Sequence, residues 1–125
     1  MQVEILRLLH NDNNEVLCKT DYGIAKFKWN GEAPYIGSTC EIEVDVPGIL
    51  LWDADVCFTN ESIAFYSMEK ETIIVGDIVE IGDDGYTVVQ VGKSLISVIV
   101  NNLSSPSNSR VKIVADDVIA YPISY

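Results

Sequence analysis

Residues 75–102, VGDIVEIGDDGYTVVQVGKSLISVIVNN, constrain the fold more than any other stretch, because they read as three short strands joined by tight turns. We predict turns at Asp83-Asp84-Gly85 and at Gly92-Lys93, since glycine and aspartate favour turn backbone angles. Elsewhere, short apolar segments alternate with turn residues about every 8–12 residues. No long segment has the apolar period of a helix. The chain is therefore predicted to be all-β, as a sandwich or a barrel.

The first half of the chain follows the same pattern. Residues 3–9 form an apolar opening that fits a strand better than a short helix, since an Asn- and Asp-rich turn follows. A hairpin loop is predicted at residues 21–23, with a positive φ at Gly23. Residues 53–70 read as a connector with one short strand around residues 63–66. From the alternation, the predicted core residues are Phe27, Trp29, Ile42, Val44, Ile78, Val89, Val98 and Ile113.

Residues 24–52 and residues 96–122 share one plan. Each stretch has an apolar strand, a loop that holds a proline, an alternating strand and a final apolar strand. The shared plan indicates either a duplication or the ordinary pattern of successive β-strands. We predict a single compact β unit over residues 1–125, with sub-halves 1–52 and 71–125 and a connector at 53–70.

The C-terminal run 72–122 offers three meander strands, a loop at 101–109 and two closing strands, RVKIVAD and VIAYP. In this order of strands it resembles a small barrel of the oligonucleotide/oligosaccharide-binding (OB) type. The resemblance implies antiparallel barrel elements with few exposed edges, in which Gly76 and Gly85 relieve tight curvature at corners. Residues 1–52 would be a second, degenerate copy. The resemblance implies no single function, because this fold carries many.

The chain is acidic: 19 Asp and Glu residues stand against 8 Lys and Arg residues, a net charge of −11. This balance argues against a nucleic-acid backbone or an anionic membrane as the main partner, because both attract cationic side chains. It suits a basic protein partner, or simply a soluble protein whose copies repel each other. No signal peptide and no apolar span are visible, and the three cysteines (Cys18, Cys40, Cys57) suggest no disulfide framework. We therefore expect a cytoplasmic protein with reduced thiols.

Residues that carry chemistry are sparse. His10 is the only histidine, and it lies beside a polar turn, so we expect it to be a solvated turn residue. The cysteines have no CxxC pairing, and the acidic stretches 53–56 and 82–85 lack the spacing of a calcium loop. The chain is therefore expected to have no catalytic residue, no metal and no cofactor, and to be no enzyme.

An acidic row is the first candidate site. Glu41, Glu43 and Asp45 alternate with apolar residues on one predicted strand, and Asp53 and Asp55 are its candidate continuation. The row is either a solvated sheet face or a surface that docks a basic protein. Small size, acidity and the lack of catalytic residues give the chain a generic resemblance to bacterial immunity proteins. That resemblance implies the neutralisation of a basic toxin or nuclease.

An aromatic and basic strand is the alternative candidate site, formed by Tyr22, Lys26, Phe27, Lys28 and Trp29. Interleaved aromatic and basic side chains are typical of surfaces that bind single-stranded nucleic acid. However, strand alternation places both Phe27 and Trp29 on one face and both lysines on the other. That pattern favours an aromatic core face and a wet lysine face. An OB-like module for nucleic acid or oligosaccharide, and a structural or interaction protein, remain the alternative functions.

Overall fold

The computed structural model describes residues 1–10, 14–103 and 108–123. These residues form twelve β-strands and one short 3-10 segment, η1 (Asp83–Gly85), and no α-helix, so the all-β prediction is confirmed. The strands are β1 (Gln2–Leu8), β2 (Glu15–Thr20), β3 (Gly23–Trp29), β4 (Thr39–Asp45), β5 (Ile49–Leu51), β6 (Val56–Phe58), β7 (Ala64–Ser67), β8 (Thr72–Ile81), β9 (Tyr86–Val91), β10 (Ser94–Asn101), β11 (Arg110–Ala115) and β12 (Ile119–Pro122).

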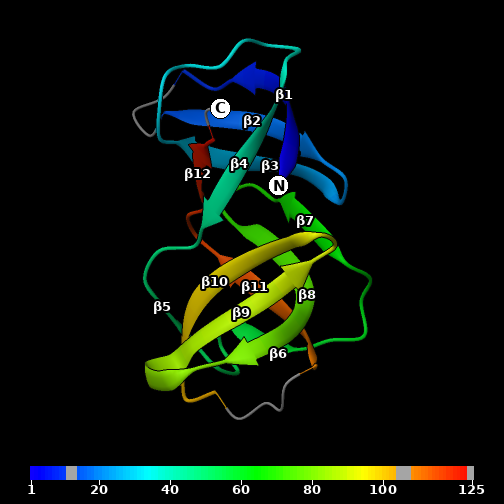
Figure 1. Cartoon of the computed structure of the whole chain (residues 1–125), viewed down its shortest axis with the longest axis vertical. Helices are drawn as coiled ribbons and strands as arrows, with labels where there is room; N and C mark the ends of the chain where they lie inside the picture. The colour runs from blue at the N-terminus through cyan, green and yellow to red at the C-terminus, as the bar shows by residue number, and fades with distance from the viewer. Residues whose placement is uncertain (11–13, 104–107, 124–125) are drawn as a thin grey trace.

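Five strands form a small barrel in the order β1-β2-β3-β12-β4. The pairing of β4 with β1 closes it. This barrel fills the upper half of the molecule in Figure 1. The hairpin between β2 and β3 turns at residues 21–23, where Gly23 has a φ of 145°, as the sequence predicts. Pairing of β12 with β3 is parallel, whereas its pairing with β4 is antiparallel.

The second sheet fills the lower half of Figure 1 and has the strand order β5-β10-β9-β8-β11-β6. Its centre is the predicted meander β8-β9-β10, with the turns at residues 83–85 and 92–93. A single bridge between Trp52 and Val56 joins the ends of the sheet, which is thus nearly closed. The connector 53–70 holds β7, which pairs with β8 near the expected position, and also β6, which was not predicted.

The two halves of the chain exchange their fifth strands. In each half, three meander strands are followed by a fourth strand that pairs antiparallel with the first, β4 with β1 and β11 with β8. The fifth strand then pairs in parallel with the third strand of the other half, β5 with β10 and β12 with β3. Figure 1 shows β5 in the lower half and β12 in the upper half.

The exchange corrects one expectation, that residues 119–122 close the C-terminal barrel. β12 instead completes the barrel of the first half. The physical reason lies in two short connections, 46–48 and 116–118, which do not form hairpins with the strand before them. Each connection leads the chain away from its own sheet into the other one. Strand pairing therefore crosses between the predicted sub-halves 1–52 and 71–125.

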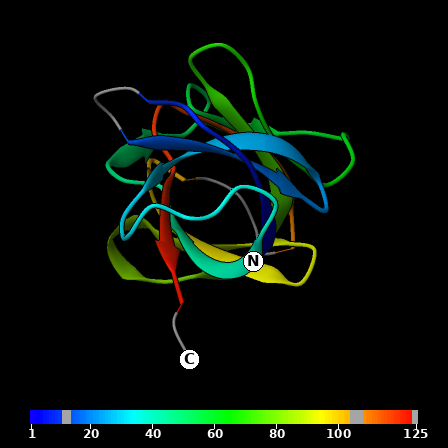
Figure 2. The same cartoon turned by 90° about the horizontal axis from the view of Figure 1, so that it is seen from above.

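One hydrophobic core runs through both sheets. Phe27 of β3 stacks on Phe65 of β7, with ring centroids 5.4 Å apart, and thus links the first barrel to the second sheet. Of the predicted core residues, Val44 is half-buried and all others are buried, namely Phe27, Trp29, Ile42, Ile78, Val89, Val98 and Ile113. The predicted strand registers are therefore confirmed, because a slip by one residue would have exposed these side chains. Figure 2, a view from above, shows the strands of the first barrel curving around a common centre.

Candidate functional site

The acidic row lies on β4, in the upper half of the molecule. The side chain of Glu43 is exposed, and those of Glu41 and Asp45 are half-buried, whereas the intervening Ile42 is buried. Strand alternation produces this arrangement, because successive side chains point to opposite faces of a sheet. The structure thus brings Glu41, Glu43 and Asp45 together, as the sequence predicts.

Little positive charge balances this row. The amino group of Met1 lies 3.3 Å from a carboxylate oxygen of Glu41. Within residues 1–10, 14–103 and 108–123, neither Glu43 nor Asp45 forms an ion pair. Like charges on one strand face repel each other, so this row makes the surface of β4 locally negative.

Asp53 and Asp55 do not continue the row. They lie in the turn between β5 and β6, on the second sheet. Asp53 has a φ of 68°, and a carboxylate oxygen of Asp55 accepts a hydrogen bond from the backbone N–H of Leu51 at 2.8 Å. Both aspartates are thus explained by turn chemistry, in which short acidic side chains bond to nearby backbone groups.

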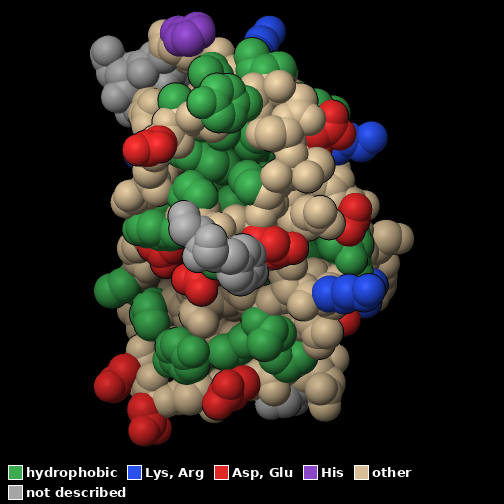
Figure 3. Space-filling model, turned by 45° about the horizontal axis from the view of Figure 1, so that its top comes forward, with side chains coloured by type: hydrophobic (Ala, Val, Ile, Leu, Met, Phe, Trp, Pro, Cys, Tyr) green, Lys and Arg blue, Asp and Glu red, His purple; other side chains and the backbone are tan. Residues whose placement is uncertain are grey.

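A groove of about 570 Å³ separates β4 from β10. Glu41, Glu43 and Asp45 line one wall, and residues 93–97 line the other. The second wall carries the side chain of Leu95, which is 64% exposed. Figure 3 shows acidic side chains across the middle of this face, with hydrophobic side chains above and below them. The groove thus combines three carboxylates with the exposed apolar side chain of Leu95 and with Lys93.

The β10 side of this groove was not predicted from the sequence. The strand LISVIV buries Ile96, Val98 and Val100 and turns Leu95, Ser97 and Ile99 outward. Exposed leucine and isoleucine on alternate positions of one strand could have indicated a surface for a partner. Its position opposite the acidic row depends on how two sheets pack, which local alternation does not reveal.

The alternative candidate site is divided between core and surface. Phe27 and Trp29 are buried, and the indole N–H of Trp29 donates to the backbone oxygen of Glu32 at 2.9 Å. Lys26 and Lys28 point outward, as the alternation predicts. Because both rings are in the core, they offer no exposed face on which a base could stack.

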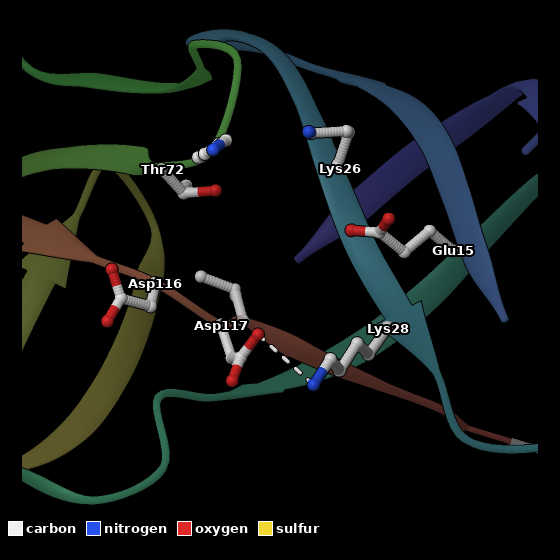
Figure 4. A pocket seen from close by; sticks show the side chains of 8 residues that line it. Glu15, Lys26, Lys28, Thr72, Asp116 and Asp117 are labelled. Atoms are coloured by element: carbon white, nitrogen blue, oxygen red, sulfur yellow. Dashed lines mark ion pairs between the residues drawn. The ribbon is translucent and has the colours of Figure 1, made fainter. Parts of the chain in front are cut away.

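Figure 4 shows the surroundings of these two lysines. They line a small cavity of about 20 Å³ together with Asp116 and Asp117. The ammonium group of Lys28 lies 3.1 Å from a carboxylate oxygen of Asp117, and that of Lys26 donates to the backbone oxygen of Glu69 at 2.6 Å. Both lysines thus already have partners within the protein.

The thiols differ strongly in exposure. Cys18 is buried, Cys40 is half-buried and Cys57 is exposed, and none of the three forms a disulfide. Burial and the neighbouring Cys40 raise the pKa of the Cys18 thiol to about 12. Burial and the Glu41 carboxylate raise the pKa of Cys40 as well. Both thiols are therefore protonated at neutral pH and are weak nucleophiles and weak metal ligands.

The described ranges contain no group of three or more His, Cys, Asp or Glu side chains that could hold a metal ion. His10 is exposed just after the end of β1. In the same ranges, no helix has the length and hydrophobicity needed to cross a membrane. The fold and this site define the chain as a small all-β barrel protein with an acidic groove between its two sheets. Comparisons with protein-family models, with curated protein sequences and with solved structures found no match.

Proposed function

We propose that this chain is a non-catalytic protein-binding module whose acidic groove docks a basic protein. The observation that carries the proposal is the groove between β4 and β10, where three carboxylates face a wall that exposes the apolar side chain of Leu95 and also holds Lys93. Charge attracts and orients a basic partner during its approach. Apolar area such as the Leu95 side chain then supplies affinity that does not depend on charge.

In the most specific form of this proposal, the partner is a basic toxin or nuclease, and the chain acts as its immunity protein or inhibitor. Nucleases bind phosphate groups through Lys and Arg side chains. A protein with a net charge of −11 and a row of carboxylates is suited to covering such a cationic surface. The cytoplasmic location expected from the sequence fits this role.

A second candidate function follows from the first barrel. We propose that this barrel is of the OB type, because five strands in the order β1-β2-β3-β12-β4 make a closed Greek-key arrangement. Barrels of this type bind oligonucleotides or oligosaccharides on the face of the second and third strands. Lys26 and Lys28 lie on that face of β3. The charge of the chain and the buried aromatic rings give this alternative less support.

The test is charge reversal on the groove. The wild-type protein captures a partner from a lysate of its own host, and the association rate of the purified pair is then measured at several salt concentrations. Glu41→Lys combined with Glu43→Lys should slow association at low salt about 10-fold or more, because steering by charge is lost. The difference should shrink at high salt, where the Debye length falls to ~3 Å at 1 M.

The matched control is Glu80→Lys combined with Asp83→Lys. Glu80 in β8 and Asp83 in η1 are both exposed, neither lines the groove, and the change in net charge is the same. This control should slow association less than the groove variant. If the groove variant associates as fast as the control at low salt, the acidic groove is not the docking surface. Binding of a generic single-stranded oligonucleotide by both variants and wild type would instead favour the OB-type function.

A further inference from the structure

The edge of β10 is only partly paired. On one side, residues 94–99 pair with β9. On the other side, β5 pairs only with residues 99–101. Within the ranges that the structure describes, no strand pairs with residues 94–98 on that side. About half of β10 is therefore an open strand edge.

The backbone groups on this open edge belong to Leu95 and Ser97. The backbone oxygen of Asn101 accepts a hydrogen bond from the N–H of Trp52 at 3.0 Å, on the β5 side. Alternate residues of a strand direct their N–H and C=O groups to the same side. Residues 95, 97, 99 and 101 therefore point their backbone groups toward the β5 side. Leu95 and Ser97 lie before the start of β5, where both line the groove and Ser97 also lies near residues 45–48.

This edge lacks the protection that exposed edges normally have. Natural proteins block such edges with charged side chains, prolines or bulges. Residues 94–98 are Ser, Leu, Ile, Ser and Val, with no charge and no proline, and their pairing with β9 is regular. The acidic row of β4 forms the opposite wall of the same groove. The open edge thus lies beside a row of carboxylates in which, among the described residues, only Glu41 forms an ion pair.

We propose that residues 94–98 receive an extended basic segment of the partner protein, which adds to the second sheet as a further strand in line with β5. The inference rests on the function proposed above, and it specifies how the partner is held. Backbone hydrogen bonds to Leu95 and Ser97 supply affinity, as in other cases of strand addition. Every second side chain of the added strand faces the carboxylates of Glu41, Glu43 and Asp45, so the segment alternates Lys or Arg with smaller or apolar residues.

The first test uses peptides as probes of the full-length protein. One probe is a fluorescent eight-residue peptide of alternating lysine and valine. The other is the same peptide with N-methyl groups on its two central residues, which removes one amide donor from each edge and keeps the charge. Strand addition predicts that methylation weakens binding about tenfold, the loss expected for one or two hydrogen bonds. Equal binding of the two peptides would overturn strand addition.

The second test changes the protein. Ser97→Pro removes the N–H that faces the groove, whereas Ser97→Ala keeps it and is the matched control. We expect the proline variant to bind the unmethylated peptide about tenfold more weakly and the alanine variant to bind like wild type. If the proline variant does not fold, the peptide comparison still decides the question.

Charge reversal separates this inference from the proposed function. Suppose that the wild type binds both peptides equally and that Glu41→Lys with Glu43→Lys abolishes binding of both. The acidic groove is then supported as the docking surface, and strand addition is wrong. If the unmethylated peptide does not bind at millimolar concentration, or binds equally to the charge-reversed protein, both proposals fail. Support requires that binding is sensitive both to the carboxylates and to the peptide backbone.

Discussion

The hydroxyl group of Tyr22 lies directly over Gly92, so closely that a Cβ atom on the glycine would overlap the tyrosine oxygen. Tyr22 belongs to the hairpin turn between β2 and β3, and Gly92 to the turn between β9 and β10. The backbone oxygen of Tyr22 also accepts a hydrogen bond from the N–H of Phe65 at 3.0 Å. The hairpin tip of the first barrel is therefore fixed against the meander of the second sheet.

Gly92→Ala should destabilise the protein for two reasons. Gly92 has a φ of 61°, where a side chain costs about 1–2 kcal/mol, and the new methyl group must displace the Tyr22 ring. Gly37→Ala is the control, since Gly37 has a φ of 86° and a methyl group added there would meet no atom within 4 Å. We expect urea unfolding to show a loss of about 1–2 kcal/mol for Gly37→Ala and about 1 kcal/mol more for Gly92→Ala.

A double variant isolates the contact between the two turns. On a Tyr22→Ala background, the extra cost of Gly92→Ala should disappear and only the backbone strain should remain. If Gly92→Ala costs no more than Gly37→Ala in the wild-type background, the close approach of the two turns does not contribute to stability.

The exchanged strands predict that the halves of this chain fold only together. Fragments 1–60 and 61–125, cut between β6 and β7, should each lack a cooperative unfolding transition, because each barrel then lacks its fifth strand and has open edges. Mixed in equal amounts, they should form a 1:1 complex with the circular dichroism of the intact protein. Fragment 61–118, which lacks β12, is the control and should not restore it. A cooperative transition for fragment 1–60 alone would contradict this prediction.

The cysteines should react with a thiol reagent at very different rates. At pH 8, exposed Cys57 should be modified quickly, whereas Cys18 should react only as fast as the protein unfolds, since it is buried and its pKa is about 12. Mass spectrometry of the labelled protein over time identifies the order of modification. The same reaction in concentrated urea is the control, in which all three thiols should react together. Rapid labelling of Cys18 in the folded protein would be inconsistent with this structure.

The ion pair between Asp77 and Arg110 should make stability depend on pH on the acid side. The guanidinium group of Arg110 donates to both carboxylate oxygens of Asp77, at 2.8 and 3.0 Å, and joins β8 to β11. These hydrogen bonds lower the pKa of Asp77 below its ordinary value. The pair therefore stabilises the folded state above the pKa of Asp in the unfolded chain, ~3.9, and this contribution is lost as the pH falls through the lower folded pKa.

Asp77→Asn should therefore lower the urea midpoint slightly at pH 7, since the pair is partly exposed. The difference from wild type should shrink as the pH is lowered toward 2. Asp84→Asn, at an exposed position in η1, is the control. It should change neither the urea midpoint at pH 7 nor the way that this midpoint depends on pH. A difference between wild type and Asp77→Asn that stays constant from pH 7 to strongly acid pH would contradict the assignment.

Local alternation was sufficient to predict the faces of individual strands. Phe27 and Ile42 are buried, and Lys26 and Glu43 point outward. Successive side chains of a strand point to opposite faces, so apolar and polar residues that alternate in the sequence reveal which face is buried. The three residues of β6 were missed because they are too few to show a period and follow an acidic turn.

The pairing of whole strands was not predictable in this way. The residues of β12 are compatible with pairing to many strands. Nothing in their order indicates whether β12 joins the sheet of its own half or the barrel of the other half. The groove was missed for the same reason. It arises where β4 of one barrel passes β10 of the other sheet, a contact set by packing between segments far apart in the chain.

The position of β12 also determines when this protein can fold during its synthesis. Residue 119 pairs with residue 28, roughly 90 positions earlier, which corresponds to about 5–20 s of translation at ~5–20 residues per second. Until the ribosome has delivered β12, the facing edges of β3 and β4 stay open on the nascent chain. The N-terminal barrel, although made first, is completed last. The nascent chain therefore depends on dilution or on chaperones to keep those edges from pairing with other chains.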